Sequence, residues 1–334
     1  KINISGLRQN GVEVVECQTD KKGISKYFDL IKKHRELRGK YDVMIVGYPG
    51  FQFVILARFL TRKPIIFDAF LSLYDSMVLD RKQVAQGSLR AKYFWWLDKI
   101  SMSLADIVLI DTNEHKKYLS KEFGIDDKKI ERIFLGADTD IFYPRKTSGN
   151  KTNFKVLFYG TYIPLQGIEY IIRSAKILEN EKDISFELIG SGQERKKMNK
   201  LAEEMNSGNI TFFDSVPIDK LAERVSTADV CLGVFGKTEK TKRVIPNKVY
   251  ECVSMRKPVI TADTPAEREL FEDGELILVK LFDPKSISDA IIKLKENNGL
   301  RDSIGEKGYK KFIDKVTPDK IGFELIRIIN ERYR

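Results

Sequence analysis

Short apolar runs rich in β-branched residues alternate along the chain with longer stretches whose apolar residues recur at helical spacing. The runs are bounded by Gly, Pro, Asn and Asp, the residues that favour turns. This alternation is typical of βαβ units, in which parallel strands are joined by helices. It predicts an α/β fold of doubly wound parallel sheets, in which ligands bind at the carboxyl ends of the strands.

The apolar runs fall into two sets, one in each half of the chain. In the first half we expect strands at residues 12–16, 41–48, 64–70, 106–111 and 132–135. In the second half we expect them at residues 155–159, 185–189, 210–213, 230–235, 258–262 and 276–279. Helical spacing fills the gaps, notably at residues 167–178, 194–205, 247–255 and 285–295.

The 334-residue length suggests two domains, because one domain typically takes about 150 residues. The best boundary is residues 143–151, a polar segment with Pro and Gly and no periodicity. We expect an amino-terminal Rossmann-like domain over residues 1–146 and a second over residues 152–318, facing each other across a cleft. A helix over residues 319–334 is expected to pack back toward the amino-terminal domain. The opening residues read as a helix end, so we expect the usual first strand to be missing from this sequence.

Composition excludes several classes of protein. Mean hydropathy is −0.30, and no apolar run approaches the roughly 20 residues that a membrane-spanning helix needs. The cysteines, Cys17, Cys231 and Cys252, are odd in number and widely spaced, which excludes a disulfide scaffold and a cysteine-based metal site. Two histidines are too few for a zinc centre. This cysteine usage fits a reducing cytosol, so we expect a cytoplasmic protein.

Positive charge is concentrated in the first half of the chain. Residues 1–150 hold 26 Lys and Arg against 19 Asp and Glu, whereas residues 151–334 hold 32 against 29. Such an excess suits nucleic acid, an anionic membrane surface or anionic small molecules, and it also occurs on ordinary lysine-rich surfaces. No nucleic-acid-binding motif accompanies it, so we expect no nucleic-acid partner.

The most informative stretch is residues 243–260, RVIPNKVYECVSMRKPVI. Pro246 at a first helical position and Asn247 beside it predict a helix start, and Lys248 and Glu251 then share one face. A helix N-terminus binds anions, and a carboxylate beside it can accept both hydroxyls of a ribose. The pattern therefore suits a nucleoside diphosphate; an amphipathic helix with a surface salt pair fits the spacing equally well.

Taken with four other segments, this stretch resembles the family 4 retaining glycosyltransferases, whose two-domain fold is called GT-B. The similar segments follow one another in the family's order along nearly the whole chain. They are residues 135–144 (LGADTDIFYP), 158–168 (FYGTYIPLQGI), 188–192 (LIGSG), 226–230 (STADV) and 243–260.

The resemblance implies transfer of a sugar, with retention, from a UDP- or GDP-linked donor to an acceptor hydroxyl. The acceptor would be a glycolipid, a lipid-linked oligosaccharide or a polysaccharide, reached from the amino-terminal domain. Neither a bound metal nor another cofactor is implied. A location in the cytoplasm, with possible peripheral contact to the inner face of the membrane, is expected from the basic first half.

Site residues follow from the matching positions. Glu251 matches the glutamate that holds the donor ribose in this family. The residues expected to bind the donor diphosphate are Gly160, Arg243, Asn247 and Lys248. The strand-to-helix turn with Gly190 and Gly192 is expected to face the nucleotide.

Three positions depart from the family pattern. Arg243 replaces a glutamate expected near the donor sugar, while Thr161 and Gln166 replace the Arg and Lys that usually neutralise the diphosphate. Because the leaving phosphates must still be neutralised, we hypothesise that Arg243 and Lys248 supply this charge. The rival interpretation is that phosphate binding and activity have been lost.

Four acidic or imidazole residues in the first half need interpretation. Asp68 ends a buried strand where the family commonly has a His, so it is our candidate catalytic residue, to orient the donor sugar or activate the acceptor hydroxyl; a helix cap is the alternative. Asp138 and Asp140 are expected to fix a turn and not to bind metal. His115 is expected at the surface.

Residues 90–104 interleave basic and aromatic side chains. At helical spacing Tyr93, Trp96 and Ile100 share an apolar face with Leu97 and Leu104, which we expect to be core. The opposite side, with Trp95 and Met102, would pack on a loop or touch a lipid or partner.

Two other functions stay open. One is a GT-B-fold nucleotide-sugar epimerase, and the other is a non-catalytic nucleotide-sugar-binding or partner subunit.

Overall fold

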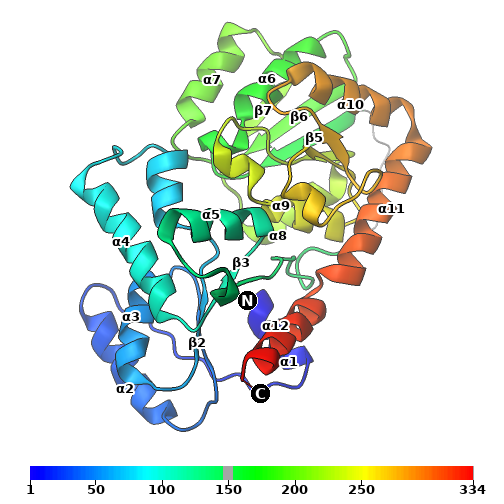
Figure 1. The fold of residues 1–334 in the computed structure, drawn as a ribbon. Coiled ribbons are helices and arrows are strands. Elements are labelled where there is room, and N and C mark those ends of the chain that lie inside the picture. Colours follow the sequence, from blue (N-terminus) through cyan, green and yellow to red (C-terminus); the bar gives the residue numbers. More distant parts are fainter. Residues whose placement is uncertain (146–152, 334) are drawn as a thin grey trace. The chain divides into compact units, whose positions relative to one another are not determined.

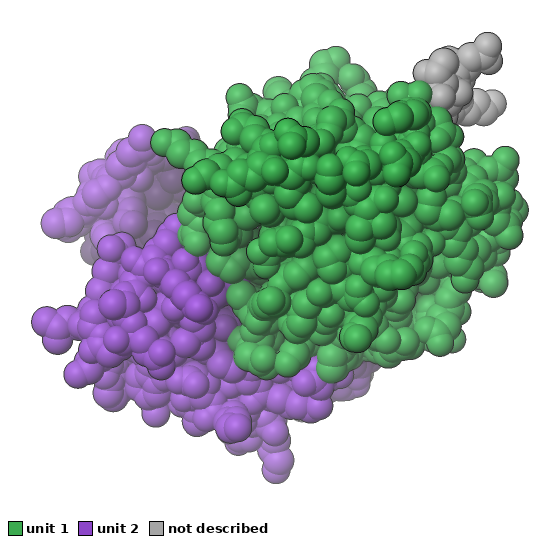
Figure 2. Space-filling view, turned by 90° about the horizontal axis from the view of Figure 1, so that it is seen from above, with its two compact units in different colours: residues 1–2, 135–321 green, residues 3–134, 322–334 purple. Residues whose placement is uncertain are grey.

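A computed structural model describes residues 1–145 and 153–333 and divides the chain into two compact units, coloured separately in Figure 2. Unit 1 contains residues 1–2 and 135–321, and unit 2 contains residues 3–134 and 322–334. Most of the expected linker at residues 143–151 lies outside the described residues. Each unit is built on its own parallel sheet, which confirms the predicted α/β fold.

The sheet of unit 1 has six parallel strands in the order β10-β9-β8-β5-β6-β7, of which β5, β6 and β7 are labelled in Figure 1. They are β5 (Phe154–Tyr159), β6 (Ile184–Ile189), β7 (Ile210–Phe213), β8 (Val230–Leu232), β9 (Val259–Ala262) and β10 (Ile277–Val279). All six lie within a residue or so of the predicted strands, except that β8 is three residues shorter at its end. The chain adds strands to one side of β5 and then to the other, which is the doubly wound order.

The strands of unit 1 are apolar along their length because helices cover both faces of such a sheet. Val156, Phe158, Phe186 and Leu188 are fully buried between them. Apolar side chains of α6 and α10 join the same core. The helices are α6 (Ile168–Ile177), α7 (Arg195–Glu204), α8 (Ile218–Thr227), α9 (Asn247–Ser254), α10 (Pro284–Glu296) and α11 (Asn298–Lys315). Short helical turns lie at η3 (Pro164–Gln166), η4 (Glu239–Lys242) and η5 (Glu267–Glu269).

Unit 2 has a four-stranded parallel sheet in the order β1-β2-β3-β4. The strands are β1 (Met44–Val46), β2 (Ile65–Asp68), β3 (Ile107–Ile110) and β4 (Ile130–Arg132). Its helices are α1 (Ile2–Gln9), α2 (Ser25–Leu37), α3 (Phe51–Leu60), α4 (Leu89–Leu104) and α5 (Asn113–Phe123), with the turns η1 (Asp75–Asp80) and η2 (Asp127–Lys129). The last helix, α12 (Pro318–Tyr333), begins in unit 1 and ends in unit 2, where Gly322 packs directly on Gly6 of α1.

Two predicted strands of the first half are wrong. Residues 12–16 form no strand in the described chain, because their alternating valines find no partner strand and Val12 and Val15 stay more than a third exposed. The strand expected at residues 132–135 instead lies at Ile130–Arg132, where Ile130 pairs with Val108 of β3. The full pairing of β4 with β3 fixes a register that the short apolar run left open.

The predicted buried side of α4 is only partly right, because Leu97 is buried and Leu104 is partly buried, as expected, but the other three residues are not. Tyr93, Trp96 and Ile100 are exposed, whereas Met102 is buried and Trp95 is partly buried. The buried side carries Asp98 and Ser101, which make hydrogen bonds to neighbouring segments. No helix within the described residues is long and apolar enough to cross a membrane.

Candidate functional site

The switch point of the unit 1 sheet lies between β5 and β8, where the order of the strands reverses. Loops leave these two neighbouring strands in opposite directions, so a crevice at their carboxyl ends is where ligands bind in doubly wound sheets. The loop after β5 begins at Gly160, and the loop after β8 begins at Gly233. The sequence-predicted donor residues collect at this edge.

Gly160 and Gly190 stack on each other after β5 and β6. Gly160 has φ of 151° and Gly190 has φ of 135°, backbone conformations that residues with a side chain rarely adopt. A Cβ on Gly190 would lie 2.0 Å from the carbonyl oxygen of Gly160. A Cβ on Gly192 would lie 2.7 Å from the backbone nitrogen and oxygen of Tyr162. These glycines let two loops meet with no side chains between them.

The ammonium group of Lys248 reaches this pair of loops from the start of α9. Its Nζ donates to the side-chain oxygen of Gln166 and, at 3.4 Å, to the carbonyl oxygen of Gly233. A Cβ on Gly160 would lie 3.2 Å from the same nitrogen. Lys248 therefore contacts the loops after both β5 and β8 and spans the switch point.

The environment of Lys248 is dominated by burial. Its side chain is buried, and Nζ lies 3.8 Å from the centroid of the Phe158 ring. Burial lowers the pKa of Lys248 to about 7, against an ordinary 10.5. A phosphate beside Nζ would restore the charged form, because an anion stabilises the ammonium that burial penalises.

Gln166 gains a structural explanation that sequence reasoning missed. It stands where the family usually has a cation, and its amide oxygen accepts the Lys248 hydrogen bond. A lysine at this position would place a second ammonium against Lys248, and like charges at such a distance repel. The neutral Gln166 and the cationic Lys248 are thus compatible neighbours, whereas two cations at these positions would repel each other.

Glu251 lies one turn after Lys248 on α9. Its Oε2 accepts a hydrogen bond of 2.7 Å from the hydroxyl of Tyr159, the last residue of β5. Burial raises the pKa of the Glu251 carboxyl, and the Tyr159 hydrogen bond partly offsets this. Tyr159 is a second residue that sequence reasoning missed, and its hydrogen bond holds the Glu251 carboxyl in place.

The remaining two donor residues flank this cluster. Asn247 is exposed at the first residue of α9, and Pro246 is the N-cap, one position earlier than predicted. Arg243 directly follows the turn η4 and is half-buried. Its neighbour Val244 packs on Ile163 and Leu165 of the loop after β5, so this segment lies against the same loop.

Asp68 belongs to unit 2 and ends β2. Its Oδ2 accepts a hydrogen bond of 2.9 Å from the side-chain amide of Asn3, and burial raises the pKa of the carboxyl to about 6. The next helical residues begin at Leu73, five positions later, so the alternative of a helix cap after the strand is wrong. A carboxyl with a pKa near neutrality at the carboxyl end of a strand is suited to proton transfer.

The other sequence candidates are structural. Asp138 accepts a hydrogen bond from the backbone N–H of Asp140, which confirms the predicted turn. His115 is fully buried and its Nδ1 lies 2.8 Å from Asp111, so the expected surface position is wrong. Among the described residues no three His, Cys, Asp or Glu side chains gather as a metal site would require.

The sequence model of the family described as glycosyl transferases group 1 matches residues 140–311, just over half of the chain. Among curated proteins, the alpha-D-kanosaminyltransferase of Streptomyces kanamyceticus is 23% identical over 71% of this chain and 63% of its own length. An uncharacterized glycosyltransferase of Methanocaldococcus jannaschii is 24% identical over 74% of this chain and 65% of its own length. The capsular polysaccharide biosynthesis glycosyltransferase CapM of Staphylococcus aureus is 24% identical over 82% of this chain and 72% of its own. This chain spans less than two thirds of the length of the first relatives that it matches.

Solved structures share the fold at low sequence identity. Sucrose-phosphate synthase from Thermosynechococcus elongatus has a TM-score of 0.72 at 16% identity, over 92% of this chain and 78% of that one. HepE of Anabaena, solved with UDP-glucose, has a TM-score of 0.70 at 14% identity, over 97% and 88% of the two chains. With its two parallel-sheet units in the GT-B fold, the chain belongs to the glycosyl transferases group 1 family.

Proposed function

We propose that the chain transfers a sugar, with retention of configuration and without a bound metal, from a nucleoside diphosphate donor to an acceptor hydroxyl. The observation that carries the proposal is the pair Lys248 and Glu251 on α9. The first brings a buried cation to the switch point, and the second holds a carboxylate one turn away. A diphosphate on Lys248 and a ribose on Glu251 match this spacing.

The diphosphate would lie over Gly160 and the start of α9. Gly160 allows close approach, and the free backbone N–H groups of the helix start favour anions. Asn247 and Arg243 complete the set, with Arg243 and Lys248 supplying the positive charge that the loop after β5 lacks. Gly190 and Gly192 would face the nucleotide. Neutralising the diphosphate stabilises the charge that develops as it leaves the sugar.

Asp68 is the candidate catalytic residue, to orient the donor sugar or accept the proton of the acceptor hydroxyl. Its hydrogen bond from Asn3 fixes one carboxylate oxygen. Retention rests on the resemblance to retaining enzymes.

UDP is the first donor nucleotide to test, with GDP as its rival. HepE was solved with UDP and with UDP-glucose, and such a ligand fits the cluster at the switch point. For the acceptor we propose a glycolipid, a lipid-linked oligosaccharide or a polysaccharide. CapM takes part in capsular polysaccharide biosynthesis, and this supports that class. We place the chain in the cytoplasm, at the inner face of the membrane.

The test starts from donor binding measured by calorimetry. Lys248→Met and Arg243→Ala should each weaken UDP binding roughly tenfold to a hundredfold, the worth of one hydrogen bond to a charged group. Lys220→Met, an exposed lysine of α8 paired with Glu223, should bind as the wild type does. If both site variants kept wild-type affinity and turnover, the hypothesis that Arg243 and Lys248 supply the positive charge would be refuted.

The role of Glu251 is tested separately, by comparing the binding of UDP and 2′-deoxy-UDP. If it holds the ribose, the wild type prefers UDP to 2′-deoxy-UDP, and Glu251→Gln loses most of that preference.

Incubation with UDP- and GDP-sugars and candidate acceptors then separates the three candidate functions. Transfer supports the proposal, conversion of one donor sugar to its epimer supports an epimerase, and binding without turnover supports a non-catalytic subunit.

A further inference from the structure

The outer side of α4 carries a stripe of large apolar side chains. Leu89, Tyr93, Trp96 and Ile100 follow one another at spacings of four, three and four residues, which places them on one face of the helix. Leu89 is 85% exposed and Trp96 is 54% exposed. We call these four residues the α4 stripe. A continuous apolar stripe left in water marks a surface that another phase or molecule covers.

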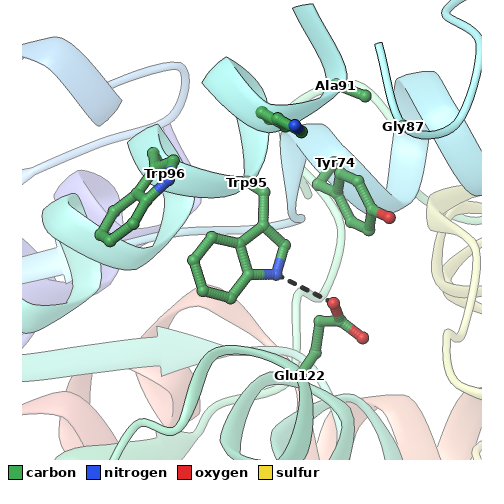
Figure 3. Close-up of a pocket in the computed structure, with 7 residues that line it drawn as sticks. Tyr74, Gly87, Ala91, Trp95, Trp96 and Glu122 are labelled. Atoms are coloured by element: carbon green, nitrogen blue, oxygen red, sulfur yellow. Dashed lines mark hydrogen bonds between the residues drawn. The ribbon is translucent and has the colours of Figure 1, made fainter. Parts of the chain in front are cut away.

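The stripe cannot turn inward, because the other side of α4 is fixed by buried hydrogen bonds. Asp98 accepts from the Ser72 hydroxyl at 2.7 Å and from the backbone N–H of Tyr74 at 2.8 Å. The Trp95 indole N–H donates to Glu122 at 2.9 Å, beside a pocket of about 170 Å³ that Lys92 and Trp96 also line (Figure 3). Rotating α4 would leave buried polar groups without partners.

Neighbouring helices extend the same surface. The Gln52 side chain on α3 donates to the Tyr93 hydroxyl at 3.0 Å and accepts from the Tyr27 hydroxyl on α2. This bridge joins the outer faces of α2, α3 and α4, which lie in sequence along unit 2 (Figure 1). Phe59 lies two turns after Gln52 on the same face of α3 and is 84% exposed.

Charge around this surface is mainly positive. Residues 21–63 and 81–104, which hold the three helices, contain 16 Lys and Arg but only four Asp and Glu, of which Asp98 is buried. Lys92 and Lys99 lie about 70–90° around α4 from the middle of the stripe. Arg62 and Lys63 follow Phe59 at the end of α3 and are exposed.

We propose that the α4 stripe and Phe59 dock the chain on an anionic phospholipid membrane. In this orientation Leu89, Ile100 and Phe59 enter the acyl boundary, Tyr93 and Trp96 sit at headgroup depth, and the flanking bases contact lipid phosphates. A symmetric pairing of two copies through this surface would bring basic face against basic face. An anionic lipid surface can cover the apolar stripe with acyl chains and pair its phosphates with the flanking basic residues.

This inference deepens the proposed function, since it explains how the chain would reach a lipid-linked acceptor. Its test needs no donor and no turnover. The full chain is floated with vesicles of phosphatidylcholine alone or of phosphatidylcholine mixed with phosphatidylglycerol. We expect binding to the mixed vesicles, little binding to phosphatidylcholine, and release as salt screens the charges.

Variants separate the apolar and the charged contributions. The double variant Leu89→Ser/Trp96→Ser should lower partitioning by at least about tenfold, the worth of burying one such side chain. Arg62→Ala/Lys92→Ala should lower it by about fivefold for each charge removed. Ile177→Ser/Ile218→Ser replaces two residues of unit 1 that are about half exposed, as Trp96 is, and should float like the wild type.

Several outcomes would overturn the proposal: no flotation with either vesicle, equal flotation with both, or wild-type flotation of the stripe variant. A dimer in sedimentation velocity that the stripe variant dissociates would assign the surface to a second copy. Saturable capture of an acidic protein in place of vesicles would assign it to a protein partner. UDP binding in the same preparations reports on the donor site, so failure of one proposal is distinguishable from failure of the other.

Discussion

At the scale of single residues, the burial of Lys248 and the role that we propose for it have opposite effects on its charge. Burial lowers its pKa to about 7, so without an anion beside it this lysine is only partly charged at neutral pH. A bound diphosphate favours the ammonium and raises that pKa again. Lys248 would therefore become fully charged only when the anion binds.

This opposition predicts the pH dependence of donor binding. Above pH about 7, UDP binding must be accompanied by proton uptake at Lys248, so UDP affinity should fall by up to about tenfold per pH unit. Calorimetry in buffers of different ionisation enthalpy measures the protons taken up. In Lys248→Met this uptake should vanish, while the protonation of UDP itself is unchanged. Equal proton uptake in the variant and the wild type would show that Lys248 does not meet the phosphates.

At the scale of elements, the stacked turns after β5 and β6 decide whether the site forms. Gly190→Ala would place a Cβ 2.0 Å from the Gly160 carbonyl oxygen in a backbone conformation that alanine disfavours. We expect a loss of about 3 kcal/mol or more in the free energy of unfolding of unit 1, together with loss of UDP binding. Urea denaturation followed by circular dichroism measures the first effect.

Gly208 provides the matched control. It lies in the same unit between α7 and β7, and a Cβ there would meet nothing within 4 Å. Gly208→Ala should therefore change stability little. Similar losses in both variants would mean that the tight contact of the two turns does not set the stability.

Elements also show what sequence could and could not predict. The strands of unit 1 were predictable because a parallel sheet buried on both faces leaves continuous apolar runs. The orientation of α4 was not, because polar Asp98 and Ser101 are on the buried side, where partners distant in sequence satisfy them. The roles of Gln166 and Tyr159 were hidden for the same reason, since their partners on α9 lie more than 80 residues away in the chain.

At the scale of the whole molecule, each unit has its own sheet and its own buried cluster. Domains with separate cores can unfold separately. The chain carries an internal probe for this, since its two tryptophans, Trp95 and Trp96, both belong to unit 2. Tryptophan fluorescence thus follows unit 2, whereas far-ultraviolet circular dichroism follows both units.

The proposed donor site lies in unit 1, so UDP should stabilise that unit alone. At a UDP concentration of about 100 times Kd, binding adds about 2.7 kcal/mol to the free energy of unfolding. On heating we expect UDP to raise the midpoint of the transition seen only by circular dichroism and to leave the fluorescence midpoint unchanged. Lys248→Met should abolish the shift. A fluorescence midpoint that rises in step with the dichroism midpoint would mean that the two units unfold as one, or that the nucleotide binds unit 2 as well.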